Sequence, residues 1–141
     1  MDVVELAGRL LFAAVFLISP AGVLAQAPRV AGLPALAALP RPLAVAAVRG
    51  TCLAAMGGAG LIALGLWPDA GALLVLAFLV PVTSTMHPFW TVEPSLARKQ
   101  KRDAFLTNTS LAGAALLLLA AVNQSQHVAL GLLAHPLLGR A

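Results

Sequence analysis

The sequence has few charged residues. Asp, Glu, Lys and Arg make up 10% of the 141 residues, and 60% of the residues are hydrophobic. A soluble domain usually has about 25% charged residues, because polar groups have to cover its surface. The composition therefore excludes an ordinary soluble domain and predicts an integral membrane protein.

Cysteine is nearly absent, which limits both disulfides and metal sites. Cys52 is the single cysteine, so no internal disulfide can form, and we expect a small buried side chain there. No C-x-x-C or H-E-x-x-H spacing is present, and we predict no metal site. Paired carboxylates and a Gly-rich phosphate loop are missing too. We therefore assign no catalytic residue and expect no catalytic activity from the chain on its own.

Acidic residues are also scarce, which leaves a net charge of +4 from nine cations and five acids. The cations are scattered and stand mostly at the ends of apolar stretches, without the clustering typical of a nucleic-acid binder. We expect no nucleic-acid partner, and we expect anionic lipid headgroups to be the partners of these cations.

Four long apolar stretches are present instead. A helix of about 20 apolar residues spans the roughly 30 Å core of a bilayer, and continuous Leu, Ala and Val without period-2 alternation favours helices over a barrel. The prediction is an all-α membrane protein: one domain, residues 1–141, folded as a four-transmembrane-helix up-down bundle. Its helices should cover about residues 3–27, 42–66, 69–86 and 104–122.

The connections carry further expectations. Gly57 and Gly65, with neighbouring alanines, predict a small-residue face on the second helix where another helix approaches closely. Asp69 is expected to cap the third helix. Residues 27–41 and the polar stretch up to Asp103 are expected to be loops, and residues 123–141 a short apolar interfacial segment.

The basic residues predict an orientation. Loops 28–41 and 91–103 collect most of the Lys and Arg, so the positive-inside rule places both loops in the cytoplasm and both termini outside.

Several motifs resemble the DoxX family of small four-helix integral membrane proteins. The similarity extends over about residues 5–122. The motifs that carry it are Leu6-Ala7-Gly8-Arg9-Leu10-Leu11-Phe12, Leu64-Gly65-Leu66-Trp67, Pro81-Val82-Thr83, His87-Pro88-Phe89-Trp90 and Phe105-Leu106-Thr107-Asn108.

The resemblance implies a four-helix bundle in the bacterial plasma membrane. It also implies a link to quinone-coupled sulfur oxidation or to membrane complexes of oxidative stress. Arg49 departs from the family pattern, which often has an acidic residue early in the second helix.

The up-down connectivity brings candidate site residues to the two membrane faces. Arg49, His87, Trp90 and Asn108 should lie near one face, where they would suit a quinone or an anionic lipid headgroup. Arg9 should lie near the other face. It is expected either to pair with Glu5 one turn earlier or to bind a headgroup or anionic ligand.

Three functional hypotheses follow. The first is an accessory or scaffold subunit of a membrane redox, respiratory or oxidative-stress assembly, with membrane proteins as partners. The second is a quinone-linked oxidoreductase subunit of the thiosulfate:quinone type, with quinone as its possible cofactor and Arg49, His87 and Asn108 at the site. The third is a lipid-binding membrane protein.

Overall fold

The computed structural model describes residues 3–93 and 96–124, and these residues are mostly helical. The predicted interfacial segment 123–141 falls, after Gln124, outside the described residues. In chain order the elements are α1 (Val3–Ala25), α2 (Ala27–Val30), η1 (Pro34–Leu36), α3 (Arg41–Leu64), α4 (Pro68–Met86), η2 (Phe89–Thr91) and α5 (Leu96–Gln124).

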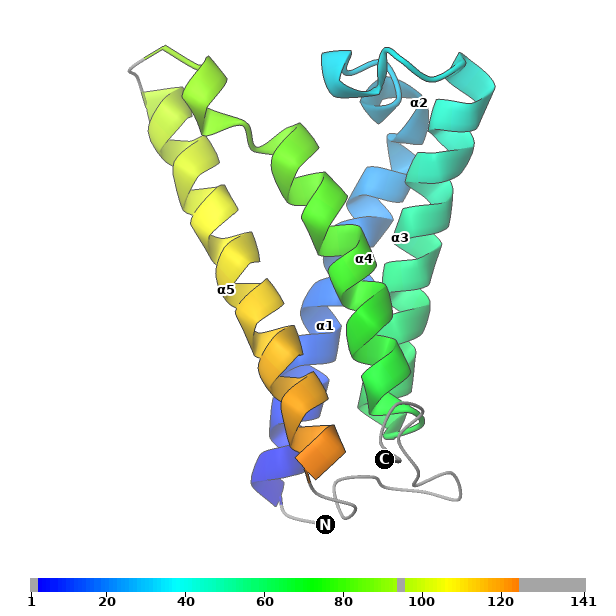
Figure 1. Cartoon of the computed structure of the whole chain (residues 1–141), viewed down its shortest axis with the longest axis vertical. Helices are drawn as coiled ribbons and strands as arrows, with labels where there is room; N and C mark the ends of the chain where they lie inside the picture. The colour runs from blue at the N-terminus through cyan, green and yellow to red at the C-terminus, as the bar shows by residue number, and fades with distance from the viewer. Residues whose placement is uncertain (1–2, 94–95, 125–141) are drawn as a thin grey trace.

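The four long helices α1, α3, α4 and α5 are long and apolar enough to cross a membrane. They alternate in direction (Figure 1). The beginning of α1 and the α3–α4 connection therefore lie at one end, called the turn end. The short elements α2, η1 and η2 lie at the other end, called the loop end. The predicted fold class, a four-helix up-down membrane bundle, is confirmed.

The start of α5 differs from the prediction. The sequence predicts a loop up to Asp103 and a helix from residue 104, whereas α5 already begins at Leu96. Its first two turns consist largely of good helix formers such as Leu, Ala, Arg, Lys and Gln. At 1.5 Å per residue, 29 residues extend about 43 Å, which exceeds the bilayer core. The basic residues therefore lie on a helical extension, and the prediction of a loop is wrong there.

The α3–α4 connection is a glycine-terminated helix end. Gly65 adopts φ 71°, in the left-handed region that glycine enters without penalty. The N–H of Gly65 donates to the Ile62 carbonyl at 3.2 Å, and the N–H of Leu66 donates to the Leu61 carbonyl at 2.9 Å. Trp67 occupies the cap position of α4, so the prediction of Asp69 as the cap is wrong. Asp69 lies in the first turn, where the helix dipole favours its negative charge.

The α3–α4 pair packs through two glycines. A Cβ atom built on Gly58 would lie 2.7 Å from the Gly71 carbonyl oxygen, and one on Gly71 would lie 2.7 Å from that of Gly58. The predicted small-residue face thus uses Gly58 instead of Gly57. A Cβ on Gly57 would meet none of the described atoms within 4 Å. Ala55 and Ala59 are buried beside the contact, as the sequence analysis expects.

The remaining long helices pack on this pair. α1 packs against α3, and α5 packs against α4 and η2. α3 and α5 therefore lie on opposite sides of α4 (Figure 1). The core between the helices is apolar, with its largest fully buried hydrophobic side chains at Phe16, Ile62, Val75 and Leu79.

The glycine contact leads to a stability prediction. Gly58→Ala forces its Cβ atom against the backbone of Gly71, so we expect a loss of about 1–3 kcal/mol in the free energy of unfolding. Gly57→Ala is the matched control, because its added methyl group faces open space and alanine favours the helix by about 1 kcal/mol. Thermal unfolding in detergent, followed by circular dichroism, measures both. Equal effects of the two substitutions would contradict the contact.

Candidate functional site

Two of the predicted site residues line one cavity. His87 and Asn108 both border a cavity of about 230 Å³ between α1, α4 and α5, and Ser19 of α1 joins them. The other lining side chains are apolar: Val15, Phe16, Val23, Phe78, Leu79, Val82, Met86 and Leu111. An imidazole, a carboxamide and a hydroxyl thus border an otherwise apolar space, and each can donate or accept a hydrogen bond.

Local backbone contacts fix His87 at the loop end. Its N–H donates to the Thr83 carbonyl at 3.3 Å, and its carbonyl accepts from the N–H of Phe89 at 2.9 Å. Lys101 of α5 donates to the Met86 carbonyl at 3.4 Å. Pro88 cannot continue the hydrogen-bond pattern of α4. α4 therefore ends at Met86, with His87 as its cap, and the hydrogen bond from Lys101 joins this helix end to α5.

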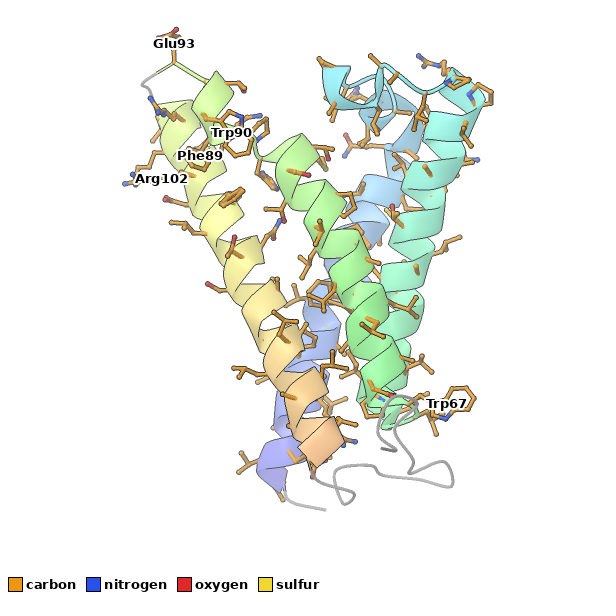
Figure 2. All side chains as sticks on the ribbon, in the orientation of Figure 1. Trp67, Phe89, Trp90, Glu93 and Arg102 are labelled. Carbon is orange, nitrogen blue, oxygen red and sulfur yellow. The ribbon has the colours of Figure 1, made fainter. Side chains whose placement is uncertain are left out.

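Trp90 belongs to an aromatic cluster beside this cavity. Its ring centroid lies 5.2 Å from that of Phe89 and 5.9 Å from that of Phe105. Both contacts are edge-to-face, the arrangement that favours aromatic pairs. Trp90 itself is 55% exposed and is not among the cavity's lining residues. Figure 2 shows Phe89 and Trp90 beside the first turns of α5, and Trp67 at the opposite end of the molecule. Two tryptophans thus stand where the two membrane interfaces are expected.

Arg49 does not join His87 and Asn108. It is exposed on α3 and does not line the cavity that they share. The preceding Val48 and the later Cys52 face the core, as their burial shows, and a helix turns about 100° per residue. Arg49 consequently points outward. Cys52 is buried, as the sequence analysis expects.

Arg9 lies at the turn end and is almost fully buried, with only 4% of its surface exposed. It forms the predicted i,i+4 ion pair with Glu5. Asp69 is also fully buried at this end of the bundle. In the part of the chain that the structure describes, these two are the buried charged residues. The main candidate site predicted from the sequence is at the loop end, whereas the buried charged residues are at the turn end.

The outward side of α3 carries a heptad pattern that the sequence analysis missed. Six residues at alternating spacings of four and three form one stripe, called the outer α3 face. Five of the six are exposed and Gly60 is partly exposed. The stripe consists of Ala46, Gly50, Leu53, Gly57, Gly60 and Leu64. The seven-residue spacing of Gly50 and Gly57 is visible in the sequence, but the outward direction of the stripe requires the structure.

Neither a search for metal-ligand clusters among the described residues nor a comparison with known proteins assigns a function to these residues. Over residues 3–93 and 96–124, no three His, Cys, Asp or Glu side chains come together to hold a metal ion. Comparison of the chain with models of protein families, with curated proteins and with solved structures returns no match. The resemblance to the DoxX family therefore rests on the motifs alone.

The buried ion pair leads to a second stability prediction. Arg9→Leu removes the charge partner of Glu5, and breaking a buried pair costs about 3–5 kcal/mol. Because the Glu5 side chain keeps 30% exposure, we expect a loss near the lower end of that range. The double variant Glu5→Leu/Arg9→Leu should regain most of the loss. Arg49→Leu, at an exposed position, should change stability little. Thermal unfolding in detergent measures the stability of the three variants. A double variant as unstable as Arg9→Leu would contradict the pairing of Glu5 with Arg9.

Proposed function

We propose that this chain is a non-catalytic accessory or scaffold subunit that binds a spanning helix of a partner membrane protein. The outer α3 face supports the proposal. Four of its six residues are glycine or alanine, and Cβ atoms built on Gly50, Gly57 and Gly60 would meet no described atom within 4 Å.

Glycine at these positions is costly unless something packs there. Each glycine inside a helix costs about 1 kcal/mol relative to alanine. A lipid-facing surface gains nothing from glycine, since lipid chains pack equally well against larger apolar residues. Small residues do allow two helix backbones to approach closely, and spanning helices associate through such faces. A second helix on the outer α3 face accounts for the three glycines.

Arg49 indicates the chemistry of that second helix. It stands next to Gly50 on the outward side, about 12 Å along α3 from Arg41. A charged group at this depth is costly unless it reaches the interface or meets an opposite charge. In a two-fold dimer through this face, Arg49 would approach its own copy and repel it. A different protein, with Asp or Glu on its spanning helix, suits the face better.

The resemblance to the DoxX family supplies the proposed setting. It is a redox, respiratory or oxidative-stress assembly in the bacterial plasma membrane. The cations of α5 and of residues 28–41 lie at the loop end. By the positive-inside rule we propose that this end lies in the cytoplasm and that both termini lie outside.

A photo-crosslinking amino acid tests the proposed contact. Placed at Leu53, in the middle of the outer α3 face, it should capture a spanning helix of another protein that carries an acidic side chain. At Leu117, which is 74% exposed on α5, it should capture mainly lipid. Mass spectrometry of the crosslinked peptides identifies the segment.

Two substitutions on or beside the outer α3 face test whether the crosslink depends on this face, and a third substitution on α5 is the control. Arg49→Glu and Gly57→Leu should each lower the crosslink yield from Leu53 at least about tenfold, because one reverses the charge and the other blocks close approach. Gly113→Leu on α5 is the matched control, since a Cβ there also meets no described atom within 4 Å. Equal yields in all three variants, or crosslinks only between copies of this chain, would refute the proposal.

The cavity at His87 supports a second candidate function, that of a quinone-linked oxidoreductase subunit. An imidazole N–H and the amide N–H of Asn108 can donate to the two carbonyl oxygens of a quinone ring, and apolar side chains surround the remaining space. Arg49 is not assigned to this quinone site, because it does not line the cavity.

Quinone content tests the second candidate. Protein purified gently from its native membrane should contain quinone, and His87→Ala and Asn108→Leu should each lower the amount at least about tenfold. Arg49→Ala should retain it, since Arg49 does not line the cavity. Unchanged quinone in both cavity variants would exclude this function. The partner crosslink from Leu53 should not depend on His87, so the two proposals can fail separately.

A further inference from the structure

A groove on the outside of the bundle adjoins the cavity at His87. It has a volume of about 240 Å³ and lies between α4 and α5. Leu79 and Asn108 line both the groove and the cavity, so the two spaces meet at these side chains. Val80 and Thr109 on the groove wall are exposed, so the groove opens on the outer surface of the spanning helices.

The groove wall is apolar, because its exposed hydroxyl groups bond to their own helices. Most Ser and Thr side chains of α3, α4 and α5 donate to a backbone carbonyl three or four residues earlier. The six that do so are Thr51, Ser84, Thr85, Thr107, Thr109 and Ser110. Two of them, Ser84 and Thr109, lie on the groove wall. The apolar residues beside them are Leu79, Val80, Phe105 and Ala112. Such a wall suits a hydrocarbon chain.

The cavity differs from the groove, because its polar side chains are free to bind a ligand. Ser19, His87 and Asn108 make no side-chain hydrogen bond within the described parts of the chain. Ser19 is exposed, and the polar side-chain atoms of His87 and Asn108 are not among the buried atoms without a partner. A ligand can therefore reach all three. The hydroxyl of Thr83, one turn before His87 on the same side of α4, is unbonded too and extends this polar surface toward the groove.

The cavity favours an uncharged head group. Among the described residues, its lining contains no Asp, Glu, Lys or Arg. Lys101 donates to the backbone of Met86 and does not line the cavity. A charged head group would therefore lose its hydration without gaining a counter-charge. Carbonyl or hydroxyl oxygens of an uncharged head can instead exchange hydrogen bonds with a hydroxyl, an imidazole and a carboxamide.

We infer that the ligand of the His87 cavity is an amphiphile with an uncharged head and a long apolar tail, and that the tail leaves the bundle between α4 and α5. The head binds Ser19, His87 and Asn108, and the tail passes Asn108 into the groove and reaches the lipid. No hydrogen bond to a described residue holds the Asn108 side chain, so it can rotate as the tail passes. The inference rests on the second candidate function, because it takes the same cavity as the site of the quinone ring.

Two quinones with the same ring and different tails test this tail route. The probes are decylubiquinone and its tail-free ring, dimethoxymethylbenzoquinone, each bound to the purified chain in lipid nanodiscs, with empty nanodiscs as the blank. Thr109→Phe places an aromatic ring in the groove. It should lower the affinity for decylubiquinone at least about tenfold and that for the tail-free ring less than about twofold. His87→Ala should lower the affinity for both probes, because they share the same head.

Thr107→Phe is the matched control. Thr107 is also an exposed threonine of α5 whose hydroxyl bonds to its own helix, but it lines neither the groove nor the cavity. This variant should bind both probes like the wild type. Unchanged decylubiquinone binding in Thr109→Phe, or an equal loss of both probes, would overturn the tail route and leave the quinone site in place. No binding of either probe to the wild-type chain would exclude the quinone site and the tail route together.

Discussion

The backbone contact between Gly58 and Gly71 determines how the other helices are placed. It lets α3 and α4 approach until each carbonyl oxygen occupies the space of the other glycine's missing side chain. α1 packs on one member of this pair and α5 on the other. The cavity at His87 and the groove beside it both lie between helices that are positioned in this way. In lipid, where apolar surface alone does not drive helices together, such close packing is what holds a bundle together.

The sequence predicts the number of spanning helices and, except for the start of α5, their approximate limits, because a bilayer requires long uncharged stretches that satisfy their own backbone hydrogen bonds. It predicts less well which side of each helix faces inward. In a soluble helix the apolar stripe marks the buried side, but in α3 both the buried and the exposed sides consist mostly of apolar residues. Gly57 and Gly58 are adjacent in the sequence, and only the structure shows that Gly58 faces α4 while Gly57 faces outward.

The candidate site shows the same limit. Connectivity predicts Arg49, His87 and Asn108 near one membrane face, and in the structure only His87 and Asn108 share a cavity. The i,i+4 spacing of Glu5 and Arg9 predicts their ion pair, whereas it does not predict the depth of burial of Arg9. The two membrane arginines thus have opposite surroundings. Arg9 faces the interior of the bundle, and Arg49 faces whatever covers the outer α3 face.

In the proposed function, protein and not lipid covers the outer α3 face in the native membrane. Oxygen accessibility of a spin label tests it most directly, with labels at Leu53 or Leu117 in a chain whose Cys52 is replaced by alanine. The Leu53 label should be shielded in native membranes and should become accessible when the purified chain is placed in lipid vesicles, while the Leu117 label should be accessible in both. A Leu53 label that is equally accessible in native membranes and in vesicles would show that lipid covers the outer α3 face.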